Sequence, residues 1–204
     1  MLIILLLSLN FTWGLNNLQN GDIVFQKSQS RQSKAIQEAT DSPWTHMGII
    51  FNKDNRWLVY EAVQPVSVTT LERFQERSKD RHIVIKRIQK QFIDLSTNEN
   101  QRRLYEELIK FYGLNYDFLF QWSDESIYCS ELIWKGIFNA FNKSLGRVER
   151  FKDMNLSGPY VKQLIKERLE QTGKELDLNE KIITPISIMN SQHLETVYDS
   201  HANL

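Results

Sequence analysis

Strand-like and helix-like hydrophobic patterns occupy different halves of this chain, and that order restricts the folds open to it. In the first half, short apolar runs rich in β-branched residues predict strands at "NGDIVFQ", "HMGIIF", "RWLVYEAV" and "HIVIKRI". From Ser96 onward, apolar residues recur every three or four positions, as they do on one face of a helix. Strands that precede helices, instead of alternating with them, predict an α+β fold in which an antiparallel sheet packs against helices.

Local signals place the ends of several elements. Ser30 has the position of an N-cap for a short helix over "RQSKAIQEAT", and the pair Asp54-Asn55 predicts a hairpin turn. Ser96 and Glu99 have the spacing of a capping box at the start of a longer helix. A further apolar stripe begins at Cys129, which therefore lies in or next to the first turn of its helix.

The length of 204 residues and the 41% hydrophobic content predict a single domain, which we assign to residues 19–200. Residues 1–18 resemble a signal peptide, because the apolar core from Leu2 to Leu9 is shorter than the roughly 20 residues that span a bilayer. The alternative is an N-terminal strand or helix packed on the domain. We expect a bacterial periplasmic or secreted protein with no stable membrane span in its mature form.

The charge balance and the cysteine count exclude several classes of protein. Lys plus Arg and Asp plus Glu number 25 each, so there is no net basic field to attract nucleic acid. Cys129 is the only cysteine, which excludes a disulfide framework and a cysteine-rich zinc module.

Two interpretations of Cys129 are open from its position. Free cysteine is often buried, and Cys129 is in phase with the apolar face of its helix, as a core residue would be. However, a helix N-terminus carries unpaired N–H groups and partial positive charge, which stabilise a thiolate and suit a nucleophile.

A nucleophilic cysteine requires a base, and His46 is the best candidate among four histidines. In "THMGIIF" it shares a strand face with Gly48, which leaves room for another backbone or a substrate. Glu61 falls on an otherwise apolar face of the next strand, so it needs a partner that donates a hydrogen bond or carries positive charge. His46 would satisfy it; the alternatives are an exposed edge position or an arginine. The remaining histidines, His82, His193 and His201, are expected in solvated or capping roles.

No cofactor or metal is expected. Cys129, His46 and Glu61 include possible zinc ligands, but the sequence has no compact ligand pair such as C-x-x-C or H-x-x-x-H to support that interpretation.

The order His, Glu, Cys is the reverse of the order in papain. It resembles the circularly permuted papain-fold proteins of the YiiX/YebB-like type, relatives of the NlpC-type cell-wall hydrolases. The stretches that carry the resemblance are "GDIVFQKSQSRQSKAIQEAT", "SPWTHMGIIF", "VYEAVQPV", "NYDFLFQWSDESIYCSELIW" and "ITPISIMNSQHLETV", which extend from Gly21 to about Val197. The implied fold is a permuted papain-like, NlpC-like domain with its nucleophile at a helix N-terminus.

The resemblance also implies a role for each candidate residue. Cys129 matches the nucleophile, His46 the base, Glu61 the residue that orients the base, and Tyr116 in "NYDF" a tyrosine that helps an oxyanion site. One departure is that Cys129 is followed by Ser130-Glu131 and not by Ser-Gly, which puts the transfer of cell-wall substrate rules in doubt.

The expected function is that of a cysteine peptidase or amidase, a thiol hydrolase that acts on a peptide or other amide, perhaps derived from peptidoglycan. One alternative is an acyltransferase or lipid-directed thiol esterase. In that case the aromatic run with Phe118, Phe120 and Trp122 would line an apolar groove; the other interpretation of these rings is that they pack in the core. Another alternative is a binding module that keeps the fold without turnover.

Overall fold

A computed structural model describes residues 17–202 of the chain. The prediction of a signal segment at residues 1–18 therefore lies almost entirely outside the described residues. In the described part, none of the helices has both the length and the apolar character needed to cross a bilayer.

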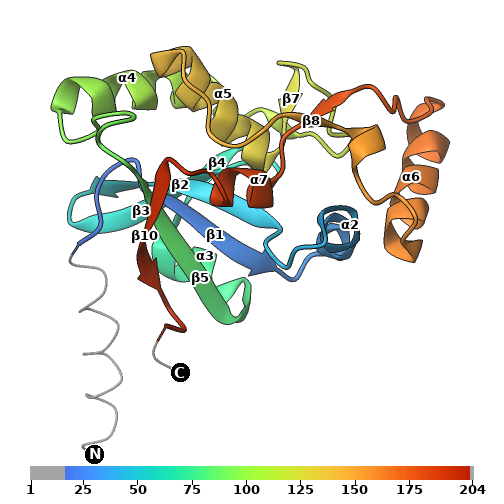
Figure 1. Cartoon of the computed structure of the whole chain (residues 1–204), viewed down its shortest axis with the longest axis horizontal. Coiled ribbons are helices and arrows are strands. Elements are labelled where there is room, and N and C mark those ends of the chain that lie inside the picture. Colours follow the sequence, from blue (N-terminus) through green and yellow to red (C-terminus); the bar gives the residue numbers. More distant parts are fainter. Residues whose placement is uncertain (1–16, 203–204) are drawn as a thin grey trace, which may run out of the picture.

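The centre of the molecule is a six-stranded antiparallel sheet in the order β10-β5-β1-β2-β3-β4 (Figure 1). The strands are β1 (Ile23–Ser28), β2 (His46–Lys53), β3 (Arg56–Glu61), β4 (Ser67–Thr70), β5 (Ser78–Ile88) and β10 (Leu194–Asp199). The antiparallel sheet with helices packed against it confirms the predicted α+β class.

Helices cover both faces of the sheet and one end of it (Figure 1). Helix α5 packs on β2 and on α4, α3 packs on β5 from the other face, and α2 packs against α6 at the end of the sheet. The helices are α2 (Arg31–Thr40), α3 (Leu71–Glu76), α4 (Asn98–Ile109), α5 (Cys129–Phe141), α6 (Pro159–Thr172) and α7 (Pro185–Met189), with a 3-10 turn η1 at Phe151–Asp153. Two short pairs complete the fold: β6 (Asn115–Tyr116) with β7 (Ser126–Ile127), and β8 (Glu149–Arg150) with β9 (Lys181–Ile182).

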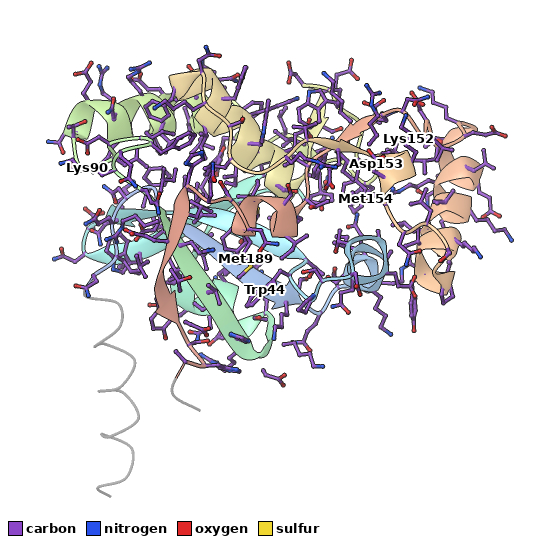
Figure 2. The ribbon with its side chains drawn as sticks, viewed as in Figure 1. Trp44, Lys90, Lys152, Asp153, Met154 and Met189 are labelled. Atoms are coloured by element: carbon purple, nitrogen blue, oxygen red, sulfur yellow. The ribbon has the colours of Figure 1, made fainter. Side chains whose placement is uncertain are left out.

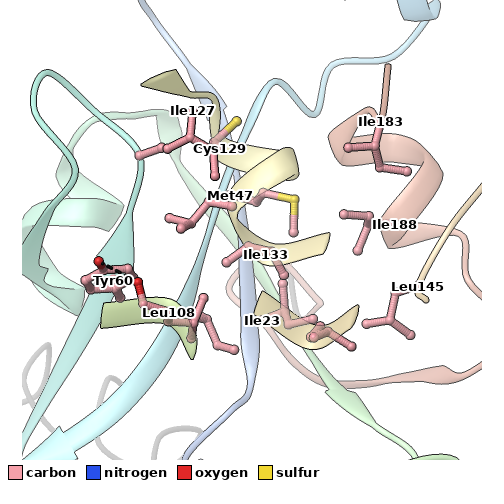
Figure 3. Packing of buried hydrophobic residues seen from close by; sticks show 14 of the residues in the cluster. Ile23, Met47, Tyr60, Leu108, Ile127, Cys129, Ile133, Leu145, Ile183 and Ile188 are labelled. Carbon is pink, nitrogen blue, oxygen red and sulfur yellow. Dashed lines mark hydrogen bonds between the residues drawn. The ribbon is translucent and has the colours of Figure 1, made fainter. Parts of the chain in front are cut away.

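Alternation along the strands divides the core between the two faces of the sheet. Ile23 and Met47 point toward α5, and Figure 3 shows them packed with Ile133 of that helix. Val24, one residue after Ile23, and Ile50, three residues after Met47, point to the opposite face with Phe74 of α3. The period-two pattern seen in the sequence thus has a packing partner on each face.

Most of the predicted element ends are observed. The Ser30 side chain accepts a hydrogen bond from the Ser33 amide at the start of α2, and Asp54 and Asn55 turn the β2–β3 hairpin with φ of 52° and 60°. The capping box at Ser96 was wrong by one residue. Thr97 is the N-cap of α4, while the Ser96 hydroxyl donates to Asp94 instead.

Neighbouring antiparallel strands place His46, Gln26 and Glu61 at one end of the sheet. Gln26 near the end of β1 lies opposite His46 at the start of β2, and β3 ends at Glu61. At Gly48 a Cβ atom would lie 2.4 Å from Cγ1 of Val59 and 3.0 Å from the carbonyl oxygen of Tyr60. The predicted close approach of another backbone at Gly48 is therefore present, whereas β3 fills the space that the alternative prediction left for a substrate.

Candidate active site

Cys129 is the first residue of α5, at the end of the sheet where His46 lies. The side chain of the N-cap, Tyr128, makes no hydrogen bond to the N–H groups of the first turn. The thiol is 2% exposed and belongs to the core cluster, next to Ile127 and Met47 in Figure 3. Cys129 is therefore both buried, as a core residue would be, and located at a helix N-terminus, as a nucleophile would be.

Glu61 binds the imidazole of His46. Nε2 of His46 and Oε2 of Glu61 are 2.6 Å apart, and the two side chains are 11% and 1% exposed. The expected contact between the two strands is therefore present. Since Nε2 is engaged by Glu61, Nδ1 is the ring nitrogen that remains for Cys129.

Arg77 is a third member of this group that sequence reasoning did not identify by number. It is the C-cap of α3, and its Nη2 donates to Oε1 of Glu61. An arginine was considered as an alternative to His46; the carboxylate in fact accepts from both. Nothing in the sequence singles out Arg77 among the arginines, because the contact depends on how α3 packs on the sheet.

Burial and charge act in opposite directions on the buried pair. Burial raises the pKa of Glu61, but the His46 imidazole and the Arg77 guanidinium outweigh it and hold that pKa below its usual range. Burial lowers the pKa of His46, but the charge of and hydrogen bond to Cys129, together with those of Glu61, raise that pKa to about 9. The imidazole thus lies near enough to both side chains to interact with each, and at neutral pH it is protonated.

Tyr116 approaches the same site from β6, which pairs with β7 just before Cys129. Burial, and then the charge of Cys129, raise the pKa of its phenol well above the ordinary value. The hydroxyl therefore keeps its proton and is available as a donor near the thiol. The structure brings together all four residues proposed from the sequence: Cys129, His46, Glu61 and Tyr116.

The space on the Cys129 side is an almost wholly apolar cavity of about 60 Å³. It lies between α2, α6 and the start of α5, and Met154, on the segment before α6, is among its lining residues (Figure 2). Phe120 also lines it and is 8% exposed, so that ring serves both the core and the cavity.

The space on the His46 side is a larger cleft of about 570 Å³, which we call the polar cleft because most of its lining residues carry hydrogen-bonding side chains. Its walls come from β1, α2, the segment after β3 and the β6 region, and Phe118 forms part of one wall while 53% exposed. The lining residues that carry hydrogen-bonding side chains are Gln26, Ser28, Gln29, Ser30, Gln32, Ser33, Thr45, His46, Gln64, Arg77 and Tyr116. Trp122, the third ring of the aromatic run, instead packs edge-on against Trp134.

The other three histidines make contacts elsewhere. His82 binds Asp199 at 2.9 Å and stacks on His201, and His193 stacks on Phe92. In the described residues they take structural roles outside the cleft and the cavity.

Ser130 and Glu131, the departure noted after the nucleophile, are buried behind it. The Ser130 hydroxyl donates to the Ile183 carbonyl at 2.8 Å, and Glu131 pairs with Lys135 at 2.9 Å. Burial raises the pKa of Glu131 to about 8 although Lys135 opposes that shift. The Ser130 contact fastens the head of α5 to the segment between β9 and α7, whereas the Glu131–Lys135 pair lies within α5 itself.

An antiparallel sheet with a histidine on an early strand, followed by a cysteine at the head of a later helix, is the arrangement of a permuted papain-like fold. Residues 17–198 match the family described as "Permuted papain-like amidase enzyme, YaeF/YiiX, C92 family", and the chain belongs to this family.

Two similar proteins come from Escherichia coli. The uncharacterized protein YiiX of strain K12 is 37% identical over 179 residues, which cover 88% of this chain and 85% of that protein. A crystal structure from strain O157:H7, described as that of the metalloprotein yiiX, is 36% identical with a TM-score of 0.80; the match covers 88% of this chain and 96% of that one.

We expect the free energy of unfolding to fall as pH rises from about 6.5 through 9, because a folded-state pKa of about 9 for His46 exceeds the ordinary 6.5. This contribution is fully present below pH 6.5 and is lost as the folded imidazolium deprotonates. The slope is at most about 1.4 kcal/mol per pH unit. Urea unfolding of the wild type and of His46→Gln between pH 6 and 10 measures it; the same pH dependence in both would contradict the assignment.

We expect Arg77→Gln to lower the free energy of unfolding by about 1–2 kcal/mol, because the buried Glu61 carboxylate loses a charged donor. The value is modest since Arg77 is 44% exposed. A depressed Glu61 pKa stabilises above the ordinary 4.5, so the difference from wild type should shrink as the pH falls below that value. Denaturant unfolding at pH 7 and pH 3 tests this, with Arg73→Gln on the exposed side of α3 as the control.

Proposed function

We propose that this protein is a cysteine-dependent amidase that works through a thioester. The observation that carries the proposal is that the His46 imidazole interacts with the buried Glu61 on one side and with Cys129, at the head of α5, on the other. A thiolate, an imidazolium and a carboxylate in this order are the groups that acyl transfer requires.

In the first half of the reaction, the Cys129 thiolate attacks the amide carbonyl carbon and the C–O electrons move onto oxygen. The His46 imidazolium gives its proton to the nitrogen as the C–N bond breaks, so an amine leaves and a thioester remains. In the second half, neutral His46 takes a proton from water, the hydroxide attacks the thioester, and a carboxylic acid and the thiolate are released. Glu61 keeps the ring oriented and stabilises its charged form throughout.

The oxyanion of each tetrahedral intermediate requires donors close to the nucleophile. The backbone N–H of Cys129 in the first turn of α5 supplies one, and the Tyr116 hydroxyl, protonated because its pKa is raised, supplies the other.

A peptide or another amide is the proposed substrate class, and its acyl group would enter the apolar cavity beside Cys129. That cavity also favours a second candidate, a thiol esterase or acyltransferase acting on an acyl chain, since its lining offers almost no polar surface. The two candidates share the thioester and differ in the bond broken and in the group that accepts the acyl chain.

A metal does not fit this site, although the solved relative is described as a metalloprotein. Both Glu61 oxygens are engaged, one by His46 and one by Arg77. Among residues 17–202, no group of three or more His, Cys, Asp or Glu side chains could hold a metal ion. The proposed mechanism therefore has no metal step.

We also propose that the protein is exported, because its N-terminal apolar segment has the length of a signal-peptide core. When the full chain is produced in a bacterium with a cell envelope, we expect the mature protein outside the cytoplasm and shortened by about 14–18 residues. Cell fractionation followed by N-terminal sequencing checks this. An intact N-terminus in the cytoplasmic fraction would contradict it.

The enzymatic proposal predicts that Cys129→Ala and His46→Ala each lower kcat/KM for acyl p-nitroanilides by about 10³-fold or more without unfolding the domain. His82→Ala is the matched control, since that imidazole lies outside the cleft and should leave the rate unchanged. The measurement is p-nitroaniline release, with circular dichroism to verify folding.

The products of the same assay separate the alternatives. Free acid as the acyl product supports an amidase. Preferential transfer to an added amine or lysolipid supports the acyltransferase, and faster cleavage of the matched acyl ester supports the esterase. Tight binding of the substrate without any product, unaffected by Cys129→Ala, would contradict all of these enzymatic functions and support a binding module.

A further inference from the structure

Gln26 is a polar side chain of the site that the mechanism above does not use. It lies directly opposite His46 in the β1–β2 ladder, so the two side chains leave the same face of the sheet as neighbours. Gln26 is only 1% exposed and lines the polar cleft.

The side-chain oxygen of Gln26 has no hydrogen-bond partner in the described part of the chain. A buried amide oxygen without a donor is unfavourable, and most such groups in folded proteins are paired. Gln26 therefore carries an acceptor beside the imidazole to which no donor of the described residues is bonded. The oxygen is enclosed in this structure, and Nε2 of Gln32 on the same cleft is an equally unpaired donor, so a ligand donor reaches the oxygen only once the Gln26 side chain turns toward the cleft.

The two spaces on either side of the catalytic pair show where that donor would come from. Cys129 lines the apolar cavity and His46 lines the polar cleft, and Ile36 and Thr45 are common to both. A substrate whose carbonyl carbon is at the thiol would place its acyl group in the cavity and its leaving nitrogen in the cleft, where His46 protonates it.

We propose that the polar cleft binds the leaving amine and that the side-chain oxygen of Gln26 accepts the N–H of the scissile amide; this inference rests on the proposed function. It assigns Gln26 as the residue that selects secondary amides over esters and N-alkylated amides, which have no N–H at that position. After His46 has protonated the nitrogen, the same N–H remains on Gln26 until the amine leaves.

The chemistry favours strong discrimination. A site built around a hydrogen bond to substrate rejects an analogue that lacks the hydrogen, because the protein group is then left unpaired. The other hydrogen-bonding groups of the cleft, such as Ser28 and Gln64, suit a polar leaving group, whereas the Cys129 side offers an apolar lining.

Binding without turnover tests the inference directly. In Cys129→Ala, calorimetry would compare an N-hexanoyl anilide with its N-methyl analogue, which keeps the carbonyl and loses the N–H. We expect the secondary amide to bind about tenfold more tightly or better. Adding Gln26→Met should remove most of that ratio, while adding Gln29→Met, an exposed glutamine of the same cleft, should preserve it.

Equal affinity for the two ligands in Cys129→Ala would overturn the inference, as would a ratio that survives Gln26→Met or no binding of either ligand. If Gln26→Met does not fold, the ratio in Cys129→Ala and its retention in Gln29→Met still decide the question. Turnover of the anilide by the wild type is measured separately. A binding ratio without turnover would defeat the proposed function and leave the role of Gln26 in place.

Discussion

The carboxylate of Glu61 is the constraint on which the rest of the site depends. It lies on an otherwise apolar strand face and is 1% exposed, so the fold must provide it with donors. His46 supplies one from the neighbouring strand, and Arg77 supplies a charged one from the end of α3. The need to pair one buried charge thereby fixes the side-chain positions on the β2–β3 hairpin, the end of α3 and the orientation of the imidazole that faces Cys129.

The proposed nucleophile and its proposed base come from different layers of the molecule. His46 belongs to the face of the sheet covered by α3, where it stacks on Phe74, whereas Cys129 belongs to the helix layer on the opposite face. They meet because β2 begins where α5 begins, at the end of the sheet. A site at a strand end can draw on both layers, and this explains why an apolar cavity and a polar cleft lie so close together on either side of one pair of residues.

The local features of the fold were predictable because they depend on near neighbours in the chain. Period-two runs gave β1, β2, β3 and β5, and the polar pair Asp54-Asn55 gave the hairpin turn. The position of Glu61 on an apolar face predicted that it needs a partner, with His46 and an arginine among the alternatives, and the structure has both contacts. Arg77 could not be inferred, since it reaches Glu61 only after α3 has packed, and nothing local distinguishes it from other arginines. Of the two roles predicted for Gly48, the close approach of another backbone is present and the room for a substrate is not, because Val59 and Tyr60 of β3 fill the space. Tyr116 was identified through the family resemblance and not through its local pattern.

The arrangement of the two spaces has a consequence for the order of events during turnover. Under the proposed mechanism the amine departs through the cleft while the acyl group is still held as a thioester in the cavity, so the two products leave one after the other by different routes. The vacated cleft is then the entrance for whatever attacks the thioester. Water there completes hydrolysis, whereas a second amine that fits the same polar walls receives the acyl group. Whether water or a second amine occupies the cleft while the thioester is present would thus decide between hydrolysis and transfer of the acyl group to that amine.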